Sequence, residues 1–78
     1  MAARKIFIRF GQQSDAARLV RDAADVLEAG GLLALEVDAR RASLVAELLA
    51  RDSRYREVGV RLDLFGRERF VIGRREAR

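Results

Sequence analysis

The stretch that most constrains this 78-residue chain is residues 30–37, where two glycines precede an apolar run. Glycine tolerates the positive φ of a helix C-terminal cap, so Gly30-Gly31 predicts the end of a helix that runs to Ala29. The residues that follow predict a strand with one face formed by Leu33, Leu35 and Val37 and the other by Leu32, Ala34 and Glu36. Because both faces are mostly apolar, we expect this strand at the centre of a sheet.

Two helices are predicted from their apolar spacing. The first begins after Ser14, a suitable N-cap, with Asp15 at the positive end of the helix dipole. Its apolar stripe is Ala16, Leu19, Val20, Ala23, Val26 and Leu27, and its expected ion pairs are Arg18–Asp22 and Arg21–Asp25. The second helix is capped by Asp38 and ends at Asp52-Ser53. Its apolar seam is Leu44, Val45, Leu48 and Leu49.

Three further strands complete the prediction. Residues 5–10 alternate, with Ile6, Ile8 and Phe10 on one side. Residues 57–65 alternate with Val58, Val60, Leu62 and Leu64 on one face, and residues 68–74 carry Phe70 and Ile72 as their apolar pair. A three-residue loop, Gly66-Arg67-Glu68, pairs Phe70 with Leu64 and Ile72 with Leu62, whereas a two-residue turn mixes the faces. We therefore expect the three-residue loop.

The element order is β-α-β-α-β-β, which predicts an α/β two-layer sandwich with both helices on one face of a mixed sheet. The last strand is antiparallel, and the strand order is either 1-2-4-3 or 1-2-3-4. We expect a single domain over residues 1–78, with flexible tails at 1–4 and 75–78. The predicted open face of the sheet carries Phe7, Arg9, Glu36, Arg61, Asp63, Arg69 and Val71.

Composition limits the function classes. The chain has no Cys and no His, so it offers neither a disulfide nor the usual soft metal ligands. No apolar run reaches the roughly 20 residues of a membrane span, and we expect a cytoplasmic protein without membrane, metal or cofactor. Sixteen basic and twelve acidic residues give a net charge of +4, which permits an acidic partner such as RNA or DNA.

The arginines are the candidate nucleic-acid ligands, since the planar guanidinium binds phosphate through two parallel hydrogen bonds. The candidate residues are Arg40, Arg41, Arg61, Arg67, Arg69, Arg74 and Arg75. Phe7 and Phe65 are candidates for stacking on bases. The alternatives are a solvated surface of mixed charge and self-association, through the edge of strand 5–10 or the open face.

No catalytic arrangement is evident. Glu36 and Asp38 share a strand face, and paired carboxylates can do acid–base work. The structural alternative is that Asp38 caps a helix while Glu36 pairs with an arginine of a neighbouring strand. Ser14, Ser43 and Ser53 have no His to activate them. We expect Tyr55 to be a packing residue.

Residues 17–75 resemble the C-terminal part of class I S-adenosylmethionine-dependent methyltransferases, and most closely the release-factor glutamine N5-methyltransferases. The resemblance lies in residues 26–31, residues 32–37 and the run Asp63-Leu64-Phe65-Gly66-Arg67-Glu68-Arg69-Phe70-Val71-Ile72-Gly73-Arg74. It implies the 1-2-4-3 strand order. The element order alone also resembles the C-terminal domain of translation initiation factor three and Alba-type chromatin proteins, which bind RNA or DNA.

The departures from the methyltransferase pattern lie in its functional motifs. The Gly-rich cofactor loop after the first strand has no counterpart, and the motif Asn-Pro-Pro-Tyr is absent. Asp38 and Arg41 stand where the family usually has Gly and Gln, so no catalytic or cofactor-binding residue is carried over.

Three functional hypotheses follow. The leading one is a non-catalytic, autonomously folding fragment of a methyltransferase, truncated, excised or engineered, that acts through folding or protein contact. The alternatives are a small basic RNA- or DNA-binding module and one half of a split methyltransferase.

Overall fold

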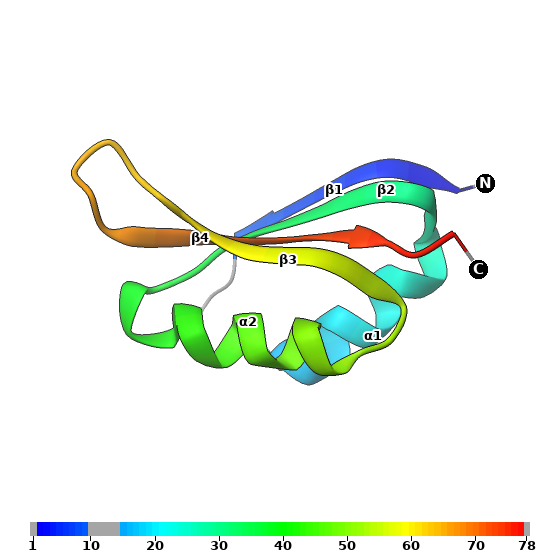
Figure 1. Ribbon diagram of the computed structural model, residues 1–78, viewed down its shortest axis with the longest axis horizontal. Helices are drawn as coiled ribbons and strands as arrows, with labels where there is room; N and C mark the ends of the chain where they lie inside the picture. The colour runs from blue at the N-terminus through cyan, green and yellow to red at the C-terminus, as the bar shows by residue number, and fades with distance from the viewer. Residues whose placement is uncertain (1, 10–14, 78) are drawn as a thin grey trace.

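A four-stranded mixed sheet with two helices on one face forms the molecule, and the computed structural model describes residues 2–9 and 15–77. The elements in chain order are β1 (Ala3–Arg9), α1 (Ala16–Val26), β2 (Leu27–Glu36), the short 3-10 helix η1 (Ala39–Arg41), α2 (Ala42–Arg51), β3 (Tyr55–Leu62) and β4 (Glu68–Arg75). The strand order is β1-β2-β4-β3, with β1 parallel to β2 and β4 antiparallel to both of its neighbours. Figure 1 shows both helices beneath the same face of the sheet. The predicted fold, and the 1-2-4-3 order implied by the resemblance, are confirmed.

The core lies between the helices and the sheet. Leu33, Leu35 and Val37 of β2 are buried, as predicted. Their buried partners are Val20, Ala23, Ala24, Leu27, Ala42, Val45, Leu49, Tyr55 and Val71. Two residues of the predicted helix stripes are instead exposed: Val26 is 48% and Leu44 is 59% accessible. In α1 the small Ala23 and Ala24 face the sheet, so the side of the helix that bears Val26 turns toward solvent.

The two central glycines do not end a helix. Helix α1 ends at Val26, and Leu27 both caps it and begins β2. Ala3 pairs with Leu27 and Lys5 with Leu32, so a step of two residues on β1 faces a step of five on β2. The intervening segment is a bulge, a site where extra residues bend a strand. Gly30 has a φ of +79° within it, and the prediction of a glycine-capped helix through Ala29 is wrong.

Strand β4 faces the opposite way from the prediction. Val71 is fully buried, and a Cβ on Gly73 would lie 3.3 Å from Leu49 Cδ2, so α2 packs directly on the backbone there. The alternating residues Phe70 and Ile72 therefore belong to the open face. The expectation that Val71 lies on the open face is wrong because the space beneath β4 admits only small side chains.

The hairpin between β3 and β4 also differs from the prediction. Phe70 pairs with Arg61 rather than with Leu64, and Ile72 pairs with Gly59. Strand β3 ends at Leu62, and residues 63–67 form the turn. The Asp63 carboxylate accepts from the backbone N–H groups of residues 65 and 67, at 2.8 and 3.0 Å. Because this turn ends β3 early, Leu64 and Phe65 are exposed in it rather than alternating along a strand.

The observed ends of the helices and strands agree only in part with those predicted from the sequence. Asp15 caps α1 by accepting from the Arg18 N–H, while Ser14 and Phe10 lie outside the described residues. Asp38 is a cap as predicted, although it begins η1 rather than α2. Strand β1 begins at residue 3 and β4 reaches residue 75, so both strands enter the predicted tails.

In the described parts of the chain, no helix is long and apolar enough to cross a membrane.

Candidate functional site

The sheet surface opposite the helices, here called the open face, has an apolar middle. The register places Phe7, Ala34, Ile72 and Gly59 in one row across all four strands. Leu32 and Phe70 lie one row to either side, and the Phe7 and Phe70 ring centroids are 6.5 Å apart. Phe7 is 57% exposed. The open face therefore carries two neighbouring aromatic rings, of which Phe7 is exposed and Phe70 is half-buried.

Charged side chains border the apolar middle on both sides. One row contains Arg9, Glu36, Phe70 and Arg61, and the other contains Lys5, Leu32, Arg74 and Arg56. Glu36 is the acidic member, and it lies 3.5 Å from Arg9 Nε and 3.6 Å from Arg69 Nε. This confirms that Glu36 pairs with an arginine of a neighbouring strand. Its charge is balanced, so cations dominate both rows.

Arg61 extends toward the apolar row. A Cβ built on Gly59 would lie 3.0 Å from Arg61 Nη1, so the guanidinium group lies across Gly59. The same nitrogen donates a hydrogen bond to the Val60 carbonyl at 3.3 Å. A side chain at position 59 would displace Arg61, and the glycine thus leaves a place for a planar cation beside Ile72.

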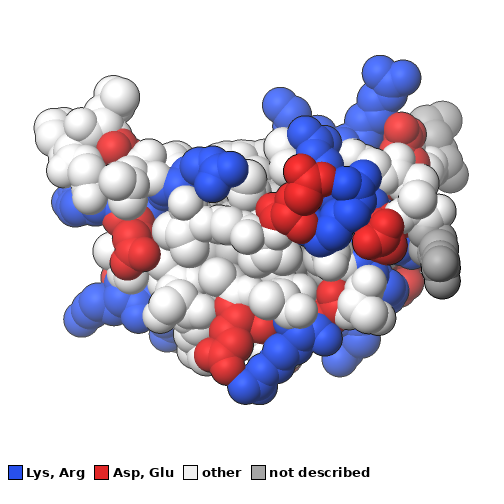
Figure 2. All heavy atoms as spheres, viewed as in Figure 1, with Lys and Arg blue, Asp and Glu red and all other residues white. Residues whose placement is uncertain are grey.

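The arginines predicted to bind nucleic acid do not form one edge. Arg69 and Arg74 are five residues apart on β4, about 17 Å, and their neighbours lie at opposite ends of the sheet. Several have structural partners: Arg40 contacts Asp38, Arg67 contacts Asp63, Arg74 donates to the Gly30 carbonyl and Arg75 to the Ala24 carbonyl. Arg41 is the last residue of η1 and occupies the N-cap position of α2. Figure 2 shows acidic and basic side chains interspersed over the viewed surface.

Two of the seven predicted arginines, Arg61 and Arg74, belong to the rows of the open face. Phe7 lies there as expected, whereas Phe65 is in the hairpin turn, with Arg67 stacked 5.5 Å from its ring centroid. Sequence reasoning left Lys5 and Phe70 out of the candidate set. The missing signal is the register of β4, which decides whether Phe70 or Val71 faces the helices.

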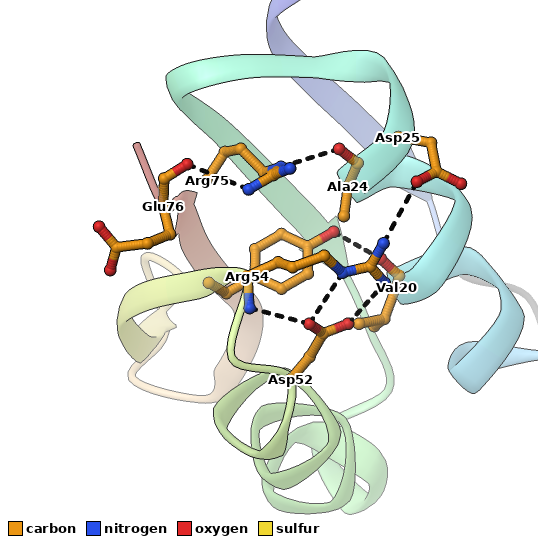
Figure 3. A network of polar contacts seen from close by, with 8 residues as sticks. Val20, Ala24, Asp25, Asp52, Arg54, Arg75 and Glu76 are labelled. Atoms are coloured by element: carbon orange, nitrogen blue, oxygen red, sulfur yellow. Dashed lines mark hydrogen bonds and ion pairs between the residues drawn. The ribbon is translucent and has the colours of Figure 1, made fainter. Parts of the chain in front are cut away.

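At the opposite end of the molecule from the hairpin, a polar network joins α1, α2 and β4 (Figure 3). The Arg54 guanidinium donates to Asp52 at 2.9 Å and to Asp25 at 3.2 Å. Asp25 therefore pairs with Arg54 rather than with Arg21 as predicted, whereas the expected Arg18–Asp22 pair is present at 3.6 Å. The network ties the end of α1 to the turn before β3.

Tyr55 is the buried packing residue that the sequence predicts. Its hydroxyl donates to the Val20 carbonyl at 2.5 Å, and burial raises its pKa to about 12. In the described part of the chain, no buried side-chain nitrogen or oxygen lacks a hydrogen-bond partner. The interior polar groups thus serve the fold.

Three aspartates are held in their ionised form. The Arg40 side chain lowers the pKa of Asp38, and the Arg54 side chain lowers that of Asp52. The backbone N–H of Arg67 lowers the pKa of Asp63. A general acid needs a pKa near the working pH, so these shifts oppose such a role.

Comparison with known proteins gives one informative relative. The chain is 49% identical over 59 residues to the release factor glutamine methyltransferase of Gloeobacter violaceus, a match covering 74% of this chain. It spans 21% of that relative's length. No family model matches the chain, and no solved structure matches it. Over these 59 residues, the chain is related to a methyltransferase.

Proposed function

We propose that this chain is a non-catalytic, methyltransferase-related module that acts by contact through its open face. The observation that carries this proposal is the apolar middle of that face, where Phe7 and Phe70 lie between two rows rich in cations. Exposed apolar surface rimmed by charged groups is typical of interaction sites. In this proposal the module derives from a larger enzyme by truncation, excision or engineering.

The roles of the carboxylates support the absence of catalysis. Asp38 caps η1 and Asp63 closes the hairpin turn, while Glu36 is held between two arginines. Each of these groups has a structural task and a cationic or N–H partner. The sequence also departs from the related enzymes at their cofactor loop and catalytic motif.

Isothermal titration with S-adenosylmethionine tests the lack of cofactor binding. We expect no binding heat from this chain, while the full-length Gloeobacter enzyme serves as the positive control under the same conditions. Micromolar binding by the chain alone would overturn the proposal, because the residues described here would then suffice to hold the methyl donor.

A split methyltransferase is the second candidate, favoured by the outer edge of β1. Within the described residues, β1 pairs with β2 on one side and presents its other edge to no strand. A second chain that supplies the remainder of an enzyme could continue the sheet there. Mixing this chain with the corresponding remainder of the Gloeobacter relative should then restore methyl transfer to a release factor. Methyl transfer by the remainder of the relative without this chain would exclude the split methyltransferase.

The likeness in element order to RNA- or DNA-binding domains is a fold analogy, and it carries no function by itself.

A further inference from the structure

We propose that the open face binds single-stranded nucleic acid, with bases stacked on Phe7 and Phe70 and phosphates held by the cations beside them. The inference rests on the proposed function, since it names the partner of the same surface. It depends on how rings and charges are placed relative to one another.

The aromatic pair supplies the surface for bases. Phe7 and Phe70 come from β1 and β4, on either side of β2, and their rings are tilted by 43°. The adjoining Ala34 and Ile72 are apolar and have no side-chain hydrogen-bonding groups. Stacking on an aromatic ring does not depend on base identity, so a surface of this kind favours single strands without strong sequence preference.

The cations lie on both sides of the rings. Lys5 and Arg9 are separated along β1 by four residues, about 13 Å, and Phe7 is midway between them. Across the sheet, Arg74 belongs to the row of Lys5 and Arg61 to the row of Arg9. A backbone that crosses the face would therefore meet a cation before and after the stacked bases. Figure 2 shows Lys and Arg side chains projecting from the right-hand part of the upper side, the side away from the helices in Figure 1, with acidic side chains among them.

The acidic side chains near these rows are few. Glu36 is 17% exposed and lies within 4 Å of two arginines, so its charge is compensated. Glu68 lies one row beyond Phe70, by the alternation of β4, at the end of the sheet nearest the hairpin. Glu57 and Glu76 both form ion pairs with Arg56, so the charge of Arg56 is compensated. The middle of the open face therefore has a net positive charge.

This charge decides between the occupants. A second copy docked face to face would bring the same cations against one another, which costs free energy. A duplex keeps its bases stacked inside the helix and would leave the two rings unused. A single strand offers phosphates and unstacked bases together, and it alone matches both features.

Fluorescence anisotropy with a labelled 12-nucleotide oligo(dT), oligo(U) and a duplex of equal length tests the proposal at low salt. We expect both single strands to bind and to compete more strongly than the duplex. Phe7→Ala should weaken binding about tenfold, within the range for loss of one base stack. Phe7→Trp should retain the affinity of the unsubstituted chain, because it keeps an aromatic ring at this position. Phe65→Ala is the matched control, because this exposed phenylalanine lies in the hairpin turn outside the open face; its affinity should not change.

Charge variants test the backbone contacts. Lys5→Gln and Arg61→Gln should each weaken binding and reduce the slope of log K against log salt by about 0.7. Arg18→Gln removes the same charge from α1, on the helical side of the molecule, and should change the slope little. Thermal unfolding of each variant verifies that the fold is retained.

Several outcomes overturn the inference. They are no binding of single strands at tens of micromolar in low salt, equal loss in Phe7→Ala and Phe65→Ala, and stronger binding of the duplex. A dimer in sedimentation velocity that Phe7→Ala dissociates would assign the face to a second copy. None of these results depends on S-adenosylmethionine, so failure here is distinct from failure of the non-catalytic assignment.

Discussion

At the scale of single residues, Tyr55 connects the two helices and the sheet. Its ring packs at the start of β3, and its hydroxyl reaches the carbonyl of Val20 in α1, 35 positions earlier. Sequence reasoning identified the packing role from the apolar ring at the end of the second helix. It could not identify the acceptor, because a partner so far away in the chain depends on how α1 lies against the sheet.

The raised pKa of Tyr55 predicts a loss of stability at alkaline pH. The unfolded chain releases the phenolic proton near pH 10, whereas the folded chain keeps it until about pH 12. The contribution of Tyr55 to the free energy of unfolding is therefore fully present below pH 10 and falls as the pH rises toward 12. Because Tyr55 is the single tyrosine and the chain has no tryptophan, absorbance titration at 295 nm reports it directly.

The control for this prediction is Tyr55→Phe. The variant should be less stable at neutral pH by about 1 kcal/mol, the usual net value of a hydrogen bond, and its stability should decline less between pH 10 and 12. Equal alkaline slopes in urea denaturation of the two proteins would contradict the assignment.

Of the two glycines in the bulge of β2, Gly31 is the one whose replacement should lower the free energy of unfolding more. An added Cβ would lie 2.9 Å from the Glu28 carbonyl oxygen and 3.1 Å from that of Ala3, and both are backbone atoms. We expect Gly31→Ala to lower the free energy of unfolding by about 2 kcal/mol, in the range for steric strain at a packed site.

Gly30→Ala is the matched comparison in the same bulge. Nothing lies within 4 Å of an added Cβ there, so the cost is that of the positive φ alone, about 1–2 kcal/mol. Chemical denaturation ranks the two variants, and a larger loss for Gly30→Ala would mean that the approach of β1 to residue 31 is not as described.

At the scale of elements, sequence patterns identified the two α-helices and four strands that the structure describes, but they missed η1 and misplaced several boundaries. Residues 27–29, Leu-Glu-Ala, have high helix propensity, and local preference therefore extended the first helix to Ala29. Pairing of Leu27 with Ala3 outweighs that preference. In the hairpin, the Asp63 side chain sets the turn, and an aspartate three residues before Gly66 is a turn signal visible in the sequence.

The most consequential error of the sequence-based prediction concerned which face of β4 points toward the helices. Phe70 and Ile72 are larger than Val71 and Gly73, so hydrophobicity alone places them inward. Leu49 and Tyr55 come so close to Gly73 that the larger pair has no room beneath the sheet. The identity of the aromatic residues on the candidate site depends on this steric fact, which sequence alternation does not contain.

Alanine substitutions on β4 test its facing. Val71→Ala should lower the free energy of unfolding by about 2 kcal/mol, because Val71 is fully buried and its truncation leaves a cavity. Ile72→Ala removes one more carbon than Val71→Ala, but from the partly exposed open face, so it should cost less. Urea denaturation of both variants measures the difference, and the reverse order would restore the facing expected from sequence.

At the scale of the whole molecule, the strand order could be predicted from the sequence, whereas the placement of the arginines on the surface could not. Element order and crossover handedness leave few arrangements, and the run at residues 63–74 selected the observed one. The arginines expected to bind nucleic acid do not form one continuous surface, because those of β4 are spread along its length and several bind carbonyls or carboxylates in the fold.

The order β1-β2-β4-β3 predicts which amides exchange most slowly with solvent. Residues 32–36 of β2 and 70–74 of β4 have neighbouring strands on both sides, so their amides should exchange only on global unfolding. Amides of residues 64–66 should exchange faster than those of β2 and β4, because the turn is exposed and its hydrogen bonds to Asp63 are local. Hydrogen exchange followed by NMR provides the measurement. Equal protection of β3 and β4 would contradict this ordering of local stability.

The two margins of the sheet are unequal. β1 runs in unbroken register from Lys5 to Arg9, whereas β3 has a register shift between Arg56 and Gly59, with Glu57 at a φ of 54°. An additional strand could pair along the regular edge of β1, whereas the irregular backbone of β3 would prevent such pairing. If two molecules paired β1 to β1, the edges left exposed would therefore be the two β3 strands, whose irregular backbone disfavours the addition of a further strand.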